Sequence, residues 1–126
     1  MEWVAIVASL ALAEYIVFMV LAGNARGRLG VPAPSTSGNA EFERYFRVQS
    51  NTVEQIVVFL PALWLFATYV SEPIAAGVGL VFILGRALYA RGYVRDPAGR
   101  GPGFLLTILA NGVLVAGGLI GATLAL

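Results

Sequence analysis

Four long apolar stretches alternate with short polar segments along the chain. They comprise residues 3–22 with the single charge of Glu14, residues 56–70 without charge, residues 74–93 with two arginines, and residues 104–126 without charge. An α-helix needs about 20 apolar residues to cross the hydrocarbon core of a bilayer. The first and fourth stretches reach that length alone, so each predicts one membrane-spanning helix.

The second and third stretches are shorter and need polar turns to complete a crossing. We predict that the second helix extends backward through residues 41–55 and that the third extends forward to Arg95. Continuous apolar runs in lipid fit helices, whose backbone groups are paired within the segment. We therefore predict an all-α, integral membrane four-helix bundle in which residues 1–126 form a single domain. Pro61 inside the second helix is expected to leave the Val57 carbonyl unpaired.

The composition agrees with a lipid environment. The chain is 59% hydrophobic and only 12% charged, whereas soluble domains carry about a quarter charged residues. It contains no Cys and no His, which excludes a thiol nucleophile, a disulfide framework and the usual zinc ligands. The net charge of +1 indicates no nucleic-acid partner, and we expect no metal site.

All basic residues are arginines, and their distribution predicts the topology. They lie in or beside the first or the third connection between helices, at Arg26, Arg28, Arg44, Arg47, Arg86, Arg91, Arg95 and Arg100. Two crossings separate these connections, so both lie on one side of the membrane. The positive-inside rule makes that side cytoplasmic and puts both termini on the opposite side. The arginine-only, Ala-, Gly- and Val-rich composition indicates a bacterial inner membrane.

Polar residues gather on one face of the second predicted helix. Arg44, Arg47, Asn51 and Glu54 are spaced by three, four and three residues, which aligns them along the helix from the interface toward the membrane interior. Ionisable groups at membrane depth are functional hypotheses by default. The alternative is an internal network, Arg47 with Glu54 or with Asn51, that only packs helices together.

A second polar stripe ends the third predicted helix. Arg86, Tyr89 and Tyr93 share one face, and Arg100 would continue it if the helix ran on past Pro97. This stripe has a purely structural alternative, because tyrosines belong to interfacial belts and arginines extend toward the headgroups.

Both stripes belong to a longer pattern. The segments FERYFRVQSNTVEQIVVFLPALW and GRALYARGYVRDPAGR carry the signatures E-R-x-x-R-x-Q-x-N-x-x-E and R-x-x-Y-x-x-x-Y. In both, the chain resembles the MAPEG family, the membrane-associated proteins in eicosanoid and glutathione metabolism, which includes microsomal glutathione transferases and leukotriene C4 synthase. The resemblance implies a homotrimer of four-helix subunits that binds glutathione between neighbouring subunits near the cytoplasmic face.

The resemblance also implies roles for individual residues. Arg47, Asn51 and Glu54 would hold the γ-glutamyl end of glutathione, and Tyr89 and Tyr93 would line the site. Gln49 would make a polar contact, and Arg26 would contribute from the adjacent subunit. Arg100 would stabilise the glutathione thiolate.

These implied roles agree with the chemistry of glutathione. Its carboxylates suit the arginine fork, its ammonium suits a carboxylate, and a nearby cation stabilises a thiolate. The implied function is a membrane-bound glutathione transferase or peroxidase that attacks lipophilic electrophiles or hydroperoxides. The lipophilic second substrate would enter from the membrane lipid.

Two positions depart from the pattern of leukotriene C4 synthase. That enzyme has Tyr where this chain has Gln55, and a second arginine, assigned a catalytic role there, where this chain has Gly27. The departures favour a general transferase or peroxidase over leukotriene synthesis. One alternative is a non-catalytic homologue that binds glutathione or lipid.

Glu14 supports a third hypothesis. It lies at mid-membrane, where it would pair with an arginine or a polar group of another helix, or act as a proton or cation site. Small multidrug-type transporters also have four helices and an acidic residue in the first. The long first connection and the arginine-rich helix ends of this chain fit that class poorly.

Overall fold

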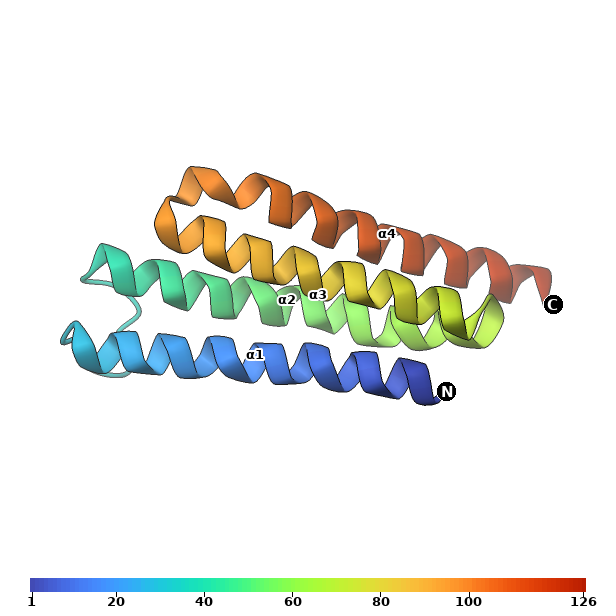
Figure 1. Cartoon of the computed structure of the whole chain (residues 1–126), viewed down its shortest axis with the longest axis horizontal. Coiled ribbons are helices and arrows are strands. Elements are labelled where there is room, and N and C mark those ends of the chain that lie inside the picture. Colours follow the sequence, from blue (N-terminus) through green and yellow to red (C-terminus); the bar gives the residue numbers. More distant parts are fainter.

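The chain folds into an antiparallel bundle of four long helices. The computed structural model describes residues 1–126 and contains α1 (Glu2–Arg28), α2 (Ala40–Tyr69), α3 (Glu72–Arg95), a short 3-10 helix η1 (Pro97–Arg100), and α4 (Gly101–Leu124), as Figure 1 shows. All four long helices are long and apolar enough to cross a membrane. The prediction of an all-α bundle with four membrane-spanning helices is therefore confirmed.

Side-chain caps define where several helices begin. The side chain of Asn39 accepts a hydrogen bond from the Phe42 amide at the start of α2, and Ser71 does the same for α3. Such caps satisfy backbone amides that have no partner within the helix. As predicted, α2 includes the polar turns that precede its apolar stretch, and it continues without a break through Pro61. Helix α1 is longer than predicted and continues to Arg28.

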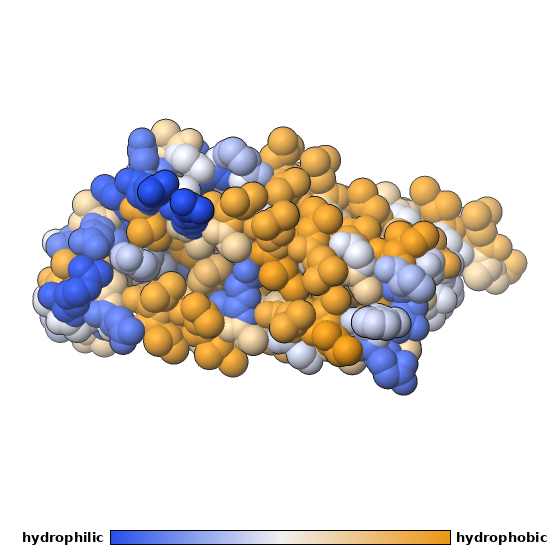
Figure 2. Space-filling model, in the orientation of Figure 1, coloured by the Kyte–Doolittle hydropathy of each residue, from blue (hydrophilic) through white to orange (hydrophobic).

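The helices pack around an apolar core along the middle of the bundle. Its centre is a stacked pair of rings, Phe59 of α2 and Phe82 of α3, with centroids 3.9 Å apart. Leu63, Ala75 and Leu114 are buried around them. Outside this core the helices expose large apolar side chains, and apolar residues cover most of the face drawn in Figure 2. A surface of this kind is suited to lipid.

Polar residues concentrate at one end of the bundle. The α1–α2 and α3–α4 connections lie together at the left end of Figure 1, with both termini at the other, and Figure 2 shows the same left end as hydrophilic. An ion pair of 3.3 Å between Arg28 and Glu41 joins α1 to α2 there. The two connections share an end as predicted, whereas the side of the membrane that this end faces stays a prediction.

Glycines bring α3, η1 and α4 unusually close at this basic end. A Cβ atom on Gly92 would collide with the backbone of Gly99, and one on Gly103 would collide with the backbone of Tyr89. Small residues permit such backbone contact between membrane helices. The result is that η1 folds back against the last turns of α3 and does not project away from the bundle.

Candidate functional site

A polar cavity opens at the basic end between α2, α3 and the start of α4. Its volume is about 550 Å³. The lining combines charged, amide and aromatic side chains, namely Arg47, Asn51, Glu54, Gln55, Tyr89, Tyr93, Arg100 and Phe104. Two segments far apart in the sequence, the start of α2 and the α3–η1–α4 region, therefore meet in one site.

Helix α2 supplies a charged pair to this cavity. The Arg47 guanidinium donates a hydrogen bond of 3.1 Å to the Glu54 carboxylate, and the two side chains are 48% and 56% exposed. The Arg47–Glu54 contact of the predicted alternative is therefore present, but both residues belong to α2, so it does not pack one helix against another. Exposed ion pairs contribute little to stability, so either partner can exchange the contact for a ligand group.

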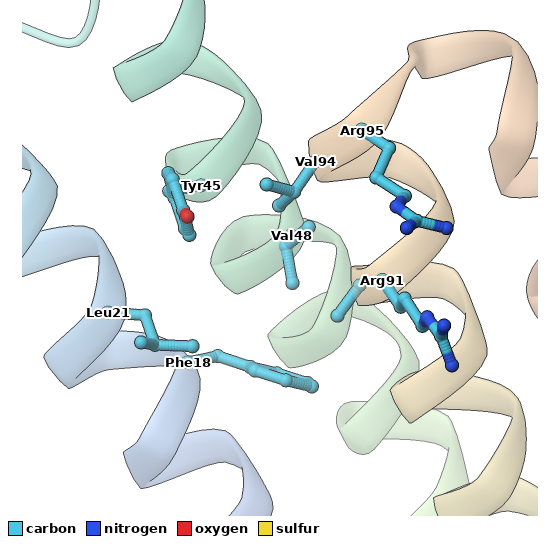
Figure 3. Close-up of a pocket in the computed structure, with 8 residues that line it drawn as sticks. Phe18, Leu21, Tyr45, Val48, Arg91, Val94 and Arg95 are labelled. Atoms are coloured by element: carbon cyan, nitrogen blue, oxygen red, sulfur yellow. The ribbon is translucent and has the colours of Figure 1, made fainter.

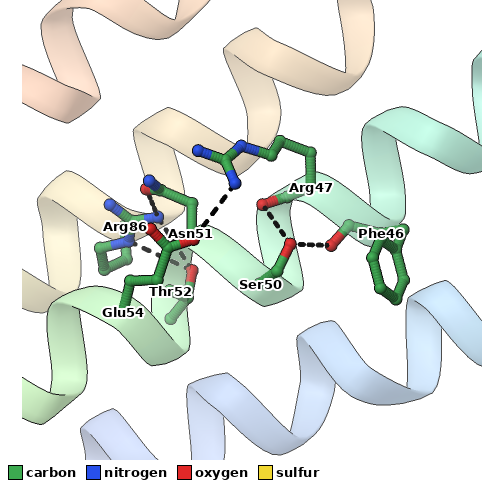
Figure 4. A network of polar contacts seen from close by, with 7 residues as sticks. All are labelled: Phe46, Arg47, Ser50, Asn51, Thr52, Glu54 and Arg86. Carbon is green, nitrogen blue, oxygen red and sulfur yellow. Dashed lines mark hydrogen bonds and ion pairs between the residues drawn. The ribbon is translucent and has the colours of Figure 1, made fainter. Parts of the chain in front are cut away.

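Arg86 forms the buried base of the site. Its guanidinium is fully buried and donates to Thr52 Oγ1 at 2.9 and 3.2 Å and to Asn51 Oδ1 at 2.8 Å, and Figure 4 shows these bonds to α2. It also donates to Thr107 Oγ1 of α4 at 3.3 Å. It also lies 4.3 Å over the Tyr89 ring. The structural alternative, in which this arginine extends toward the headgroups, is therefore wrong for Arg86, whose buried charge is compensated by these contacts.

The contact with Arg86 determines how Asn51 can act. The amide oxygen of Asn51 accepts from the Arg86 guanidinium, a group that can only donate. This assigns the oxygen to Arg86 and leaves the NH₂ group as the part of Asn51 available to a ligand. Asn51 therefore offers a hydrogen-bond donor to the cavity, which suits a carboxylate or carbonyl oxygen.

Two stacked tyrosines of α3 form the aromatic side of the cavity. The Tyr89 and Tyr93 rings are 5.5 Å apart and nearly parallel, and Tyr89 is only 2% exposed. Phe104 of α4 lies 6.5 Å from the Tyr89 ring. This arrangement gives the cavity an apolar wall opposite the charged pair of α2.

Arg100 reaches the cavity by a different route from the predicted one. Helix α3 ends at Arg95, where Asp96 is extended, so Arg100 does not continue the α3 stripe. It stands instead at the last position of η1 and lines the cavity. Its guanidinium makes one long hydrogen bond of 3.4 Å, to the Pro97 carbonyl. An exposed cation with so weak a partner is available to an anionic ligand.

Two of the predicted site residues lie elsewhere in the subunit. Arg26 donates to the Ser35 carbonyl at 2.7 Å and lies 4.7 Å over the Phe42 ring. Gln49 is half-buried and does not line the cavity. Arg44, which shares the predicted stripe, donates to the last carbonyls of α3 and ties α2 to that helix.

The cavity also includes residues that the sequence did not point to as ligands. The Gln55 side chain accepts a hydrogen bond of 3.1 Å from Asn111 of α4. Its position one helical turn after Asn51 could have indicated it. Phe104 lies beyond η1, and no local pattern in the sequence connects it with the cavity.

Glu14 has no partner in the subunit. It makes no hydrogen bond or ion pair, and its Oε1 atom is buried. The expected pairing with an arginine or polar group of another helix is therefore wrong for a single chain. Its other expected role, as a proton or cation site, stays a prediction.

Comparison with known proteins agrees with this arrangement. The model of the MAPEG family matches residues 4–120. An uncharacterized protein of Synechocystis is 48% identical over 118 residues, which cover 94% of this chain and 86% of that protein. Human microsomal glutathione S-transferase 2 is 39% identical over 105 residues, 83% of this chain and 69% of that enzyme. Rat leukotriene C4 synthase is 38% identical over 101 residues, 73% of this chain and 67% of that enzyme. The chain belongs to the MAPEG family.

Proposed function

We propose that this protein is a membrane-bound glutathione transferase with peroxidase capacity toward lipophilic hydroperoxides. One observation carries the proposal: Arg47, Asn51, Glu54, Tyr89, Tyr93 and Arg100 line a single cavity at the basic end of the bundle. Similarity to a human protein named as a microsomal glutathione S-transferase supports the same chemistry.

The charges of the cavity complement the γ-glutamyl end of glutathione. This end carries a carboxylate beside an ammonium, and the cavity offers Arg47 beside Glu54. On binding, the glutathione carboxylate pairs with the Arg47 guanidinium and the glutathione ammonium pairs with the Glu54 carboxylate. Two new ion pairs thus replace the one between Arg47 and Glu54. The Asn51 NH₂ group donates to an oxygen of the same end.

Arg100 is the residue proposed to activate the thiol. Its guanidinium stays protonated at any working pH and stabilises the thiolate, which is the nucleophilic form. The thiol proton leaves to water. With an electrophile, the sulfur forms a bond to carbon and the leaving group departs with its electron pair. With a hydroperoxide, two glutathione molecules become a disulfide while the hydroperoxide becomes an alcohol and water.

The complete site is proposed to form in a homotrimer. Arg26 and Gln49 do not line the cavity of their own subunit, and the proposal assigns both to the cavity of a neighbour. The lipophilic second substrate would reach this interface from the membrane, which brings electrophile and thiolate together. Glutathione is the proposed cofactor or cosubstrate, and the arginine-rich end is proposed to face the cytoplasm.

Gln55 and Gly27 bear on which substrates the proposed transferase would accept. Gln55 is hydrogen-bonded to Asn111, and Gly27 has open space where a further arginine would stand. These residues favour transfer to general electrophiles over leukotriene synthesis. A homologue that binds glutathione without turnover is the second candidate, because the same cavity contacts would support binding alone. No observation supports the third hypothesis, a transporter that uses Glu14, because the chain belongs to the MAPEG family.

The test combines binding with turnover. Purified protein in detergent or nanodiscs is titrated with glutathione in a thermal-shift assay, and conjugation of a lipophilic aryl halide is measured with and without glutathione. We expect Arg47→Ala to weaken binding by about 1.5–3 kcal/mol, the range for a charge-assisted contact. Arg100→Ala is expected to lower turnover by about 100-fold and to weaken binding far less.

Arg28→Ala provides the matched control. Arg28 lies at the same end, is paired with Glu41 and does not line the cavity. It should leave both binding and turnover unchanged. If the wild type binds glutathione but shows no glutathione-dependent turnover, the proposal of an enzyme is refuted and the proposal of a non-catalytic binding homologue remains. No glutathione binding at all would refute both.

A further inference from the structure

A second cavity lies on another side of α3 from the polar one. It opens between α1, α2 and α3 at the basic end and has a volume of about 310 Å³ (Figure 3). Phe18 and Leu21 of α1 and Val48 of α2 form its apolar lining, and Arg91 and Arg95 of α3 stand at its edge. No acidic side chain lines it.

A shared apolar wall separates the two cavities. Phe18, Val48 and Tyr89 form one buried cluster, with Tyr93 and Val94 packed against it. Tyr89 and Tyr93 face the polar cavity, whereas Phe18, Val48 and Val94 face the apolar one. A ligand in the apolar cavity would therefore not occupy the proposed glutathione site.

The arginines at the edge of this cavity have free guanidinium groups. Arg91 and Arg95 are exposed, and neither side chain makes an ion pair or hydrogen bond within the protein. They are four residues apart on one helix, so they stand one above the other, and Figure 3 shows both side chains extending from the same side of α3 with their guanidinium groups directed away from Phe18 and Leu21. Arg44, by contrast, is occupied by the carbonyls at the end of α3.

This combination of an apolar cavity and two unpaired cations suits one class of ligand. An acyl chain fills apolar space between helices at membrane depth, and a phosphate at headgroup level pairs with arginines at the helix end. We propose that the cavity between α1, α2 and α3 binds an anionic phospholipid, with an acyl chain against Phe18 and Leu21 and the phosphate held by Arg91 and Arg95.

The residues of α1 that line the cavity lie at different angles from Arg26, the residue that the proposed trimer presents to a neighbour. Leu21 and Arg26 are five residues apart on α1, which puts them about 140° apart around the helix. Phe18, which also lines the cavity, is eight residues from Arg26 and therefore about 80° away, so a neighbour at Arg26 would lie closer to Phe18 than to Leu21. The Tyr45 ring of α2 also lines the cavity, where its hydroxyl can meet the ester region of the lipid.

Native mass spectrometry with defined lipids tests the proposal. The full chain is mixed with phosphatidylglycerol or phosphatidylcholine of identical acyl chains, and the bound ratio is measured. We expect the wild type to prefer phosphatidylglycerol. Arg91→Gln and Arg95→Gln should each reduce this preference about fivefold, the contribution of one basic residue beside an anionic lipid. Arg28→Gln removes the same charge at the same end and should not change it.

Two further measurements separate the outcomes. Ala90→Phe fills the cavity and keeps both arginines, so it should reduce retention of both lipids while the melting temperature stays that of the folded protein. Glutathione affinity should be unchanged in all four variants, so a failed glutathione assay would not bear on the lipid result. Equal effects of Arg28→Gln and Arg91→Gln, or displacement of the lipid by inorganic phosphate alone, would overturn the proposal.

Discussion

At the residue scale, Arg86 is the side chain whose role differs most from its sequence context. It stands in a row of arginines that ends α3, and most members of that row are exposed. Arg86 is instead fully buried, and its four hydrogen bonds reach side chains of α2 and α4. A buried guanidinium is tolerable only when such acceptors surround it. It thereby joins the helices that carry the cavity and orients Asn51.

We predict that Arg86→Lys destabilises the bundle. A single ammonium cannot reproduce a planar fork that contacts three different side chains, so at least one charge-assisted hydrogen bond is lost. The expected loss is about 1.5–3 kcal/mol of unfolding free energy, seen as a lower melting temperature in detergent. Glutathione affinity should fall as well, because the Asn51 amide is no longer held in one orientation.

The matched control for this prediction is Arg28→Lys, at an exposed ion pair. It keeps the charge and should leave the melting temperature unchanged. Equal melting temperatures for the Arg86 and Arg28 variants would show that the buried hydrogen bonds contribute nothing measurable.

At the scale of elements, the close contact between α3 and η1 determines where Arg100 stands. Gly92 and Gly99 bring the two backbones together, and no side chain fits between them. Arg100 follows directly and lines the cavity beside Tyr93. The glycines therefore act on the site through backbone distance, without contacting a ligand themselves.

We predict that Gly92→Ala lowers turnover by displacing η1. The new Cβ would overlap the Gly99 carbonyl, so η1 must move away from α3 and carry Arg100 with it. A displacement of about 1 Å near reacting groups costs on the order of 100-fold in rate. The measurement is glutathione conjugation of the aryl halide, with kcat and KM determined separately.

Gly101→Ala is the control on the same segment. A Cβ atom at Gly101 would meet nothing within 4 Å, and the residue is already helical. Its turnover should remain that of the wild type. If Gly92→Ala and Gly101→Ala behaved alike, the close backbone contact would have no part in positioning Arg100.

At the scale of the whole molecule, the subunit brings only part of the predicted site together. Six predicted residues from α2, α3 and η1 line the cavity, whereas Arg26 and Gln49 do not. Arg26 is engaged with backbone carbonyls of its own first connection. The proposed trimer accounts for this division, since a cyclic assembly presents one face of each subunit to a different face of the next.

We predict that mixed assemblies recover activity that neither parent has. Arg26→Ala and Arg100→Ala subunits are co-expressed with different tags and purified through both. In the proposed trimer an Arg26→Ala subunit keeps its own Arg100 and can receive Arg26 from an Arg100→Ala neighbour. Purification through both tags keeps only trimers that contain both kinds of subunit, and each of these has one site of three with both arginines, so about a third of the wild-type sites are restored.

Glutathione-dependent turnover of the mixed sample, relative to each parent alone, is the readout for this prediction. Co-assembly of differently tagged wild-type subunits serves as the positive control for mixing. A mixed sample no more active than its parents would mean that Arg26 does not act across a subunit interface.

The sequence by itself determined the four membrane helices, the end of the bundle that carries the arginines, and the polar face of α2. These features follow from length and periodicity along one helix, which are local properties of the chain. Only the tertiary structure decided that Arg86 turns inward, that η1 returns Arg100 to Tyr93, and that Phe104 joins the cavity. The physical reason is that these contacts depend on the distance and rotation between helices, which glycine contacts and shared hydrogen bonds set.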